Sequence, residues 1–209
     1  MKTENLIAAL AADRKKALSP RRALACALAG SVAAACVLFF LLLGPRPDFM
    51  PAMHTMRFDF KFVAAFALAA SAAVAAMRLM RPESDKRLLV LLAAPALLLI
   101  AMALELIAVP AGEWGSRLIG HNAVLCMTFI PILSFAPLGL TLWALRHGAT
   151  RTPALTGAVA GLVAGGIGAL FYAAHCFDDS PLFVATWYGI AVAFMAGLGA
   201  ALGSRLLRW

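Results

Sequence analysis

Six long apolar segments constrain this chain more than any other feature of its sequence. Each approaches or exceeds the roughly 20 residues that an α-helix needs to cross a bilayer. They cover about residues 23–43, 60–77, 88–109, 120–145, 154–174 and 182–203. With 63% apolar and 13% charged residues, the chain differs from an ordinary soluble domain, which has about 45–50% and about 25%. The sequence therefore predicts an all-α integral membrane protein, a six-transmembrane-helix bundle.

Lysine and arginine residues divide the connections between these segments into two sets. The basic-rich set, with 14 of the 18 basic residues, consists of residues 1–22, 78–87, 146–153 and the C-terminal tail. The basic-poor set, with four, consists of residues 44–61, 110–117 and 175–181. Because basic-rich loops stay in the cytoplasm, we expect both termini to be cytoplasmic. This orientation also accounts for the net charge of +8 without a nucleic-acid ligand.

The first 22 residues form a polar segment with a helical pattern, and we treat them as a unit separate from the membrane domain, residues 23–209. Leu6, Ile7 and Leu10 recur at helical spacing, and Thr3 suits the N-cap position. An isolated helix of this length is marginal in water. Its apolar stripe therefore favours either the bilayer surface or a groove on a partner protein, and the residues alone leave both open.

Two of the four cysteines are expected near the outer face. Cys126 lies near the outer end of the fourth apolar segment, and Cys176 directly follows the fifth. Because a tight inner loop joins these segments, the two thiols are candidates for a disulfide or a shared metal ion, and packed structural thiols are the alternative. Cys26 and Cys36 fall within the first segment and are expected to pack as small apolar residues. No CxxC motif is present, which gives little support to a thiol oxidoreductase.

Polar residues near the two thiols invite comparison with a metal site. Those closest in sequence are His175, Asp178, Asp179 and Asn122. Their spacing does not supply a complete four-ligand zinc site. Transient soft-ligand contact through Cys126, Cys176 and His175 is the form of metal binding left open. We predict no cofactor and no catalytic residues, so the chain is not expected to be an enzyme.

A small six-helix transporter or metal-handling permease is the alternative from another functional class. Glu105 is the only acidic residue inside a predicted span, and such residues often mark an ion path. At its depth it is also expected to reach the interface or Arg117. Methionines with a histidine in the outer loop suit either Cu(I) or a loop that dips into the interface, and these are Met50, Met53, Met56 and His54.

Glycines at four-residue spacing in the fifth segment predict close helix packing. They are Gly157, Gly161 and Gly165, and the sixth segment adds Gly199 and Gly203. Small residues at this spacing let two helix backbones approach closely. We expect the partner helix to lie in the same chain.

Several stretches together resemble the NrsF family of bacterial inner-membrane anti-sigma factors, the negative regulators of sigma F. They are the start MKTENLIAALAAD, the stretch from Tyr172 to Pro181, the pair Trp187 and Tyr188, and the closing residues LLRW. The resemblance implies that the N-terminal cytoplasmic segment holds an extracytoplasmic-function sigma factor inactive. The residues expected to contact the sigma factor are Leu6, Ile7, Leu10, Asp13 and Arg14.

The same resemblance raises the importance of the outward-placed thiols. In the family two such cysteines are tied to sensing, and Cys126 and Cys176 are the matching positions. The resemblance implies release of the sigma factor under heavy-metal or oxidative stress. The expected mechanism is a shift of the fourth and fifth helices against their glycine-packed neighbours, which changes how residues 1–22 are presented.

Overall fold

A computed structural model describes residues 18–81 and 88–208, and these residues form helices and connections without a β-strand. The long helices are α2 (Pro20–Leu42), α4 (Met56–Leu79), α5 (Ala93–Ala108), α7 (Ala123–Leu145), α8 (Pro153–Ala173) and α10 (Gly189–Leu206). The short ones are α3 (Phe49–Ala52), α6 (Trp114–Ile119) and α9 (Pro181–Phe183). Leu89–Leu92 and Ala111–Glu113 are 3-10 turns, and Val184–Tyr188 is a π-helical turn between α9 and α10.

The six-helix prediction is confirmed for the described residues, which contain six helical stretches long and apolar enough to cross a membrane. Most bounds agree with the sequence expectation to within a few residues. The main correction concerns residues 44–61, which we expected to form one loop. Helix α4 already begins at Met56, because the buried charge of Lys61 is paired with Asp179 and the partly exposed charge of Arg57 with Glu105.

Local sequence sets where several helices begin. Ser19 caps α2 by accepting a hydrogen bond from the Arg22 amide, and Pro20 follows it at the first helical position. Ser180 and Pro181 repeat this arrangement at the start of α9. A serine cap accepts a hydrogen bond from a backbone amide that has no partner within the helix. Proline at the first helical position has no amide hydrogen of its own that would need a partner.

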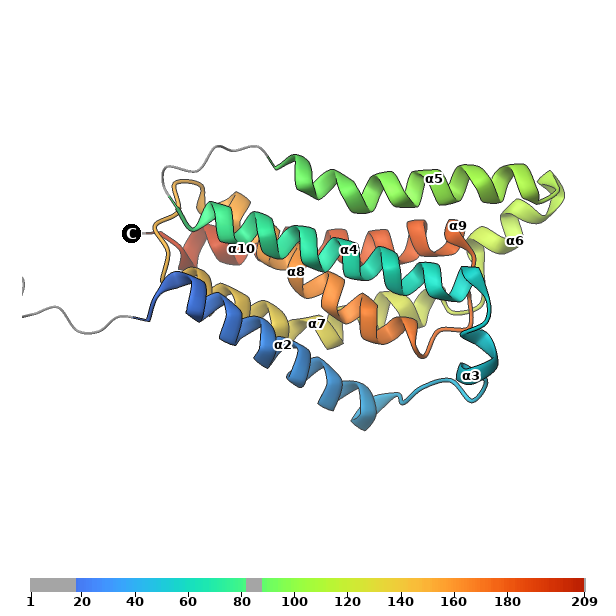
Figure 1. Cartoon of the computed structure of the whole chain (residues 1–209), viewed down its shortest axis with the longest axis horizontal. Coiled ribbons are helices and arrows are strands. Elements are labelled where there is room, and N and C mark those ends of the chain that lie inside the picture. Colours follow the sequence, from blue (N-terminus) through green and yellow to red (C-terminus); the bar gives the residue numbers. More distant parts are fainter. Residues whose placement is uncertain (1–17, 82–87, 209) are drawn as a thin grey trace, which may run out of the picture.

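The bundle is built around α8, which packs against α4, α7 and α10 (Figure 1). Helix α5 lies at the edge, alongside α4. It is the least covered of the six: 11% of its most apolar stretch is buried, whereas 67% of that of α8 is. In a membrane, the rest of the α5 surface would face lipid.

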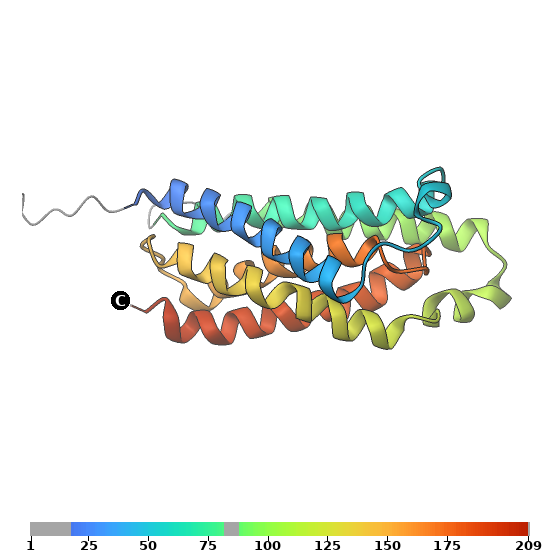
Figure 2. The same ribbon diagram turned by 90° about the horizontal axis from the view of Figure 1, so that it is seen from below.

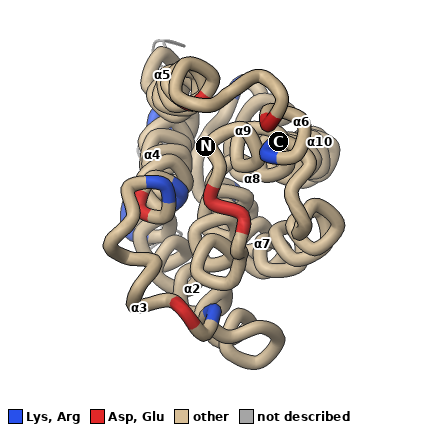
Figure 3. Tube along the Cα trace, turned by 90° about the vertical axis from the view of Figure 1, so that its right-hand side faces the viewer, with Lys and Arg blue, Asp and Glu red and all other residues tan. Residues whose placement is uncertain are grey.

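Both described ends of the chain lie at one end of the bundle, which we call the terminal end (Figures 1 and 2). The opposite end, which we call the distal end, carries α3, α6 and α9. Figure 3 looks onto the distal end, where acidic and basic positions gather around the helix ends. The cytoplasmic location of both termini remains a prediction.

Glycines bring α8 and α10 into backbone contact. A side chain at Gly161 would overlap the Met195 carbonyl oxygen, and one at Gly157 would overlap the Gly199 carbonyl oxygen. Gly203 completes this contact from the α10 side. The glycine stripe therefore packs against another helix of the same chain, as its spacing predicts.

Candidate functional site

The thiols of Cys126 and Cys176 meet at the distal end, inside the protein. Cys126 lies in the first turn of α7, and Cys176 lies three residues beyond the end of α8. Both residues are fully buried free cysteines. Their side chains pack in the same buried cluster, where the two thiols interact. The structure thus brings together the two cysteines that the sequence pointed to, although 50 positions separate them.

The carboxylate of Asp178 holds the start of α7 over this thiol pair. Its Oδ2 atom accepts hydrogen bonds from the backbone amides of His121 at 3.0 Å and Asn122 at 2.8 Å. The Asn122 side-chain amide donates a third at 2.9 Å. A carboxylate at a helix N-terminus satisfies free amides and opposes the helix dipole. Asp178 therefore fixes the position of Cys126 relative to the segment that carries Cys176.

Two basic residues hold the same segment from the other side. The ammonium group of Lys61 donates to the Cys176 carbonyl oxygen at 2.9 Å, and the Arg46 guanidinium group donates to it at 3.2 Å. Asp179 forms an ion pair with each, at 2.5 Å to Lys61 and 3.1 Å to Arg46. Asp48 also forms an ion pair with Arg46, so two carboxylates face the two basic groups. The connection between α8 and α9 (residues 174–180), which we call the hairpin, is thus fixed to the start of α4 and to the connection after α2.

The two thiols have different surroundings, and Cys176 is the one nearer to charge. A hydrogen bond from the Cys126 thiol lowers the pKa of Cys176, burial raises it, and the positive charge of Lys61 lowers it, with a net lowering. The Cys176 thiol also lies 3.7 Å from the Asp178 carbonyl oxygen. A lowered thiol pKa increases the thiolate fraction at neutral pH, and the thiolate is the form that reacts with oxidants and soft metals.

Arg46 and Lys61 are site residues that our sequence interpretation missed. We counted them only as basic residues of an outer loop, yet Lys61 is fully buried and Arg46 nearly so. The available signal was Lys61 itself, which stands between Phe60 and Phe62 at the start of an apolar run. A lysine so placed is expensive to bury unless it has a charged partner.

His175 and the acidic residues do not complete a metal site. The His175 Nδ1 atom lies 3.0 Å from the Gly44 carbonyl oxygen, so this side chain ties α2's exit to the hairpin. Asp178 and Asp179 are occupied as described above. Within residues 18–81 and 88–208, no three His, Cys, Asp or Glu side chains are grouped to hold a metal ion. A soft ion bound here would rely on the two thiols.

Glu105 is engaged in ion pairs at the distal end of α5. Its carboxylate is buried and lies 3.1 Å from the Arg117 guanidinium and 3.3 Å from that of Arg57. Ser180 contacts the same carboxylate at 3.4 Å. The expectation that Glu105 reaches Arg117 is confirmed. The pairing gives Glu105 a structural role and removes the main support for an ion path.

The methionine side chains of residues 50–56 lie on the surface of the protein. Met50, Met53 and Met56 are all exposed, Met56 almost completely. His54 is exposed as well. Exposed apolar side chains at a span end fit a segment that dips into the membrane interface.

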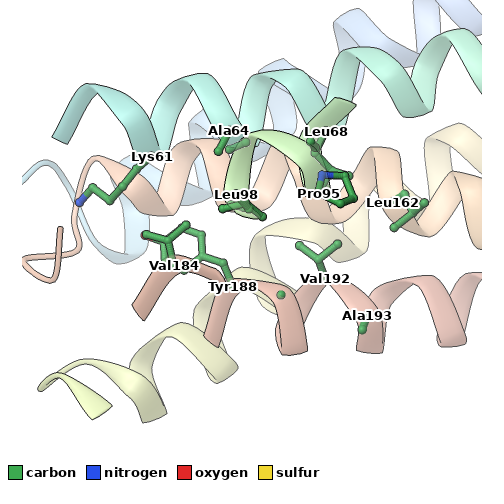
Figure 4. A pocket seen from close by; sticks show the side chains of 14 residues that line it. Lys61, Ala64, Leu68, Pro95, Leu98, Leu162, Val184, Tyr188, Val192 and Ala193 are labelled. Carbon is green, nitrogen blue, oxygen red and sulfur yellow. The ribbon is translucent and has the colours of Figure 1, made fainter. Parts of the chain in front are cut away.

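An apolar cavity of about 230 Å³ lies between α4, α5, α8 and α10 (Figure 4). Lys61 stands at one end of it and Leu162 toward the other. Tyr188 also lines the cavity. The loose cover by α5 accounts for this space, which is open on one side.

The residues predicted to contact a sigma factor lie outside the described residues. They are Leu6, Ile7, Leu10, Asp13 and Arg14. Their assignment and that of residues 1–22 as a separate unit remain predictions.

Comparisons with known proteins match this chain to one family, over nearly its whole length. Residues 9–209 match the family model described as "NrsF: Negative regulator of sigma F". The chain is 33% identical over 216 residues to "Anti-sigma-F factor NrsF" of Caulobacter vibrioides (strain NA1000 / CB15N), with 100% of both chains covered. It is 32% identical over 213 residues to "Probable anti-sigma-F factor NrsF" of Azospira oryzae (strain ATCC BAA-33 / DSM 13638 / PS), again with 100% of both covered. No solved structure matches.

Proposed function

Since the chain belongs to the NrsF family of negative regulators of sigma F, we propose that it is a membrane-bound anti-sigma factor that responds to thiol chemistry at its distal end. Its partner is a sigma factor of the extracytoplasmic-function type. The family is one of regulators, and the proposal needs no catalytic residue. The single observation that carries the sensing part is the buried contact between Cys126 and Cys176.

The sigma factor is held by residues 1–22. This segment has an apolar stripe at helical spacing, formed by Leu6, Ile7 and Leu10, and Asp13 and Arg14 add charge beside it. An amphipathic helix of this kind fits an apolar groove on a protein. The last three residues of this segment belong to α2, which begins at Pro20, so movement of α2 within the bundle changes how the stripe is presented.

The bacterial inner membrane is the proposed location, with both termini in the cytoplasm. Support comes from the 14 to four distribution of basic residues between the two sets of connections. In addition, the described chain ends share one end of the bundle. The thiol pair lies at the opposite end, where a metal or oxidant arrives first from outside.

The signal is a change in how the thiol pair holds the distal end together. Oxidation of both thiols to a disulfide, or capture of a soft metal by both, replaces a hydrogen-bonded contact with a covalent or coordinate link. This link shifts the start of α7 against the hairpin that follows α8. Helices α7 and α8 pack on each other and α2 packs on α7, so the shift has a direct route to residues 1–22. A bistable bundle is required for release.

The test is a sigma-dependent reporter in cells that contain this protein and its sigma factor. In the Cys126→Ser, Cys176→Ser double variant, we expect repression to persist and induction by cadmium or by a thiol oxidant to be lost. The Cys26→Ser, Cys36→Ser double variant is the matched control and should respond normally. Normal induction in the first variant would contradict the sensing role of the pair.

A second experiment tests the holding role of the N-terminal segment. Deletion of residues 1–15 should leave the membrane domain in place and the sigma factor constitutively active. Purified residues 1–22, used as bait, should retain the sigma factor, and a Leu6→Asp, Leu10→Asp bait should not. Full repression by the truncated protein would contradict this assignment.

A further inference from the structure

Two buried tyrosine hydroxyl groups at the thiol pair have no hydrogen-bond partner within the described part of the chain. Tyr172 belongs to α8 and is fully buried, and Tyr188 ends the π-helical turn and is 4% exposed. Their ring centroids are 5.8 Å apart. Burial of a hydroxyl without a partner costs free energy. Two such groups side by side therefore need a physical reason.

Both tyrosines pack in one buried cluster with Cys126 and Cys176. Within it the Tyr172 hydroxyl lies toward Cys126 and the Tyr188 hydroxyl toward Cys176, neither in a hydrogen bond. A neutral thiol is a weak acceptor, so this placement leaves the hydroxyl protons nearly unused while both thiols are protonated. A thiolate is an anion and accepts a much stronger hydrogen bond from the same O–H group. The arrangement is complete only when a sulfur carries negative charge.

The backbone places Tyr188 by a local irregularity. Val184–Tyr188 forms a π-helical turn within an otherwise α-helical stretch that begins at Pro181. A π-turn inserts an extra residue into a helix, and such turns are frequent at functional sites. Without this insertion, the residues before and after it would keep one helical register, and Tyr188 would point in a different direction.

We propose that Tyr188 is a positioning residue that donates a hydrogen bond to the thiolate form of Cys176, while Tyr172 faces the sulfur of Cys126. Tyr188 supports Cys176, which then acts as the reacting thiolate, and Cys126 keeps its proton and donates it toward Cys176. The pair is therefore asymmetric. This inference rests on the proposed sensing role of the pair and adds which sulfur reacts first and what stabilises it.

The other titratable and charged groups around Cys176 come from each packed element. They are Cys126 from α7, Tyr172 from α8, Lys61 from α4, Arg46 from the α2–α3 connection, and His175, Asp178 and Asp179 from its own hairpin. The acidic side chains are already bound to amides or cations. The groups that favour the anion are thus the Cys126 thiol, the charge of Lys61 and the hydroxyl of Tyr188.

The test measures the pH dependence of Cys176 modification in the full-length protein in lipid nanodiscs. A Cys26→Ala, Cys36→Ala background leaves only the buried pair, and a small uncharged methanethiosulfonate reports thiolate, with peptide mass spectrometry assigning the site. We expect Tyr188→Phe to move the midpoint for Cys176 to higher pH by about one unit, which is about tenfold in rate at a fixed pH below the midpoint.

Tyr172→Phe is the matched control, because it removes the same atom from the neighbouring ring but faces the other sulfur. It should move the Cys176 midpoint less than Tyr188→Phe does. A change in rate by the same factor at every pH, with an unmoved midpoint, would indicate altered access alone and overturn the proposal. An equal shift from both variants would overturn the assigned pairing.

The pH midpoint in nanodiscs and the induction in cells can fail independently of each other. A midpoint shift in nanodiscs supports the tyrosine role even if the cysteine variants still induce normally in cells, a result that would defeat only the sensing proposal. An unmoved midpoint together with lost induction in the cysteine variants would defeat only the tyrosine role.

Discussion

The ammonium group of Lys61 donates a 2.9 Å hydrogen bond to the carbonyl oxygen of Cys176, joining residues 115 positions apart. Lys61 is fully buried, and Asp179 pairs with its charge. A buried lysine at this position does two things at once. It ties α4 to the hairpin after α8, and it places a positive charge next to a thiol.

Replacement of Lys61 by methionine should change both the stability of the protein and the reactivity of Cys176, whereas replacement by arginine should preserve the reactivity. Lys61→Met leaves Asp179 with Arg46 alone and is expected to destabilise the protein by about 3 kcal/mol. It also removes one of the causes that lower the pKa of Cys176, so thiol modification at pH 7 should slow as the midpoint moves upward. Thermal melting in detergent and pH–rate profiles measure the two effects.

Lys61→Arg is the control, because it keeps the charge but not the shape. Its Cys176 midpoint should stay near that of the parent, even where packing strain lowers the melting temperature. An upward shift of the midpoint as large as that of Lys61→Met would show that geometry, and not charge, sets the reactivity of this thiol.

Asp178 should control how well α7 is held at its start. Asp178→Ala removes the acceptor of three hydrogen bonds from His121 and Asn122, with an expected cost of about 1–2 kcal/mol. Hydrogen exchange at residues 121–126 should quicken, and exchange in the α8–α10 contact should not. Asp178→Asn keeps a carbonyl oxygen and should show a smaller effect; equal effects would mean that the carboxylate does not cap this helix.

Most of the helix bundle and part of the candidate site can be predicted from the sequence alone. Six spans and the α8–α10 contact follow from hydropathy and from glycine spacing, because both are local patterns with a single physical reading. The sequence makes contact between Cys126 and Cys176 one of several possibilities, because the topology fixes the depth of each cysteine in the membrane but not the rotation of its helix about the helix axis. Rotation is set by side-chain packing among several helices, which no local pattern contains.

The basic residues of the site could not be assigned by the same means. Arg46 and Lys61 look like loop charges when only orientation is considered, and their burial depends on Asp179, which lies far along the chain. The unpaired hydroxyls of Tyr172 and Tyr188 were equally hidden. Aromatic residues near span ends usually mark the membrane interface, so the sequence does not reveal that these two side chains turn toward the thiols.

Glycine replacements test the packing through which a signal would pass. Gly161→Ala places a methyl group where the Met195 carbonyl oxygen lies, so α8 and α10 must separate, and we expect a loss of about 1–3 kcal/mol. Gly197→Ala is the matched control, since nothing lies within 4 Å of the added carbon. It should leave stability unchanged or raise it slightly. Comparable melting temperatures for both would contradict the close contact.

Glu105 is expected to anchor α5 to the distal end. Glu105→Gln removes the charge that faces Arg57 and Arg117, and both arginines are partly exposed and are able to turn toward water. The cost should therefore be modest, about 1–2 kcal/mol, and local: hydrogen exchange should quicken in residues 93–108 with little change in α8. Glu113→Gln, which removes the more exposed partner of Arg117, should leave α5 exchange unchanged. Faster exchange spread evenly over the whole bundle would show that Glu105 supports the fold in general and does not anchor this one helix.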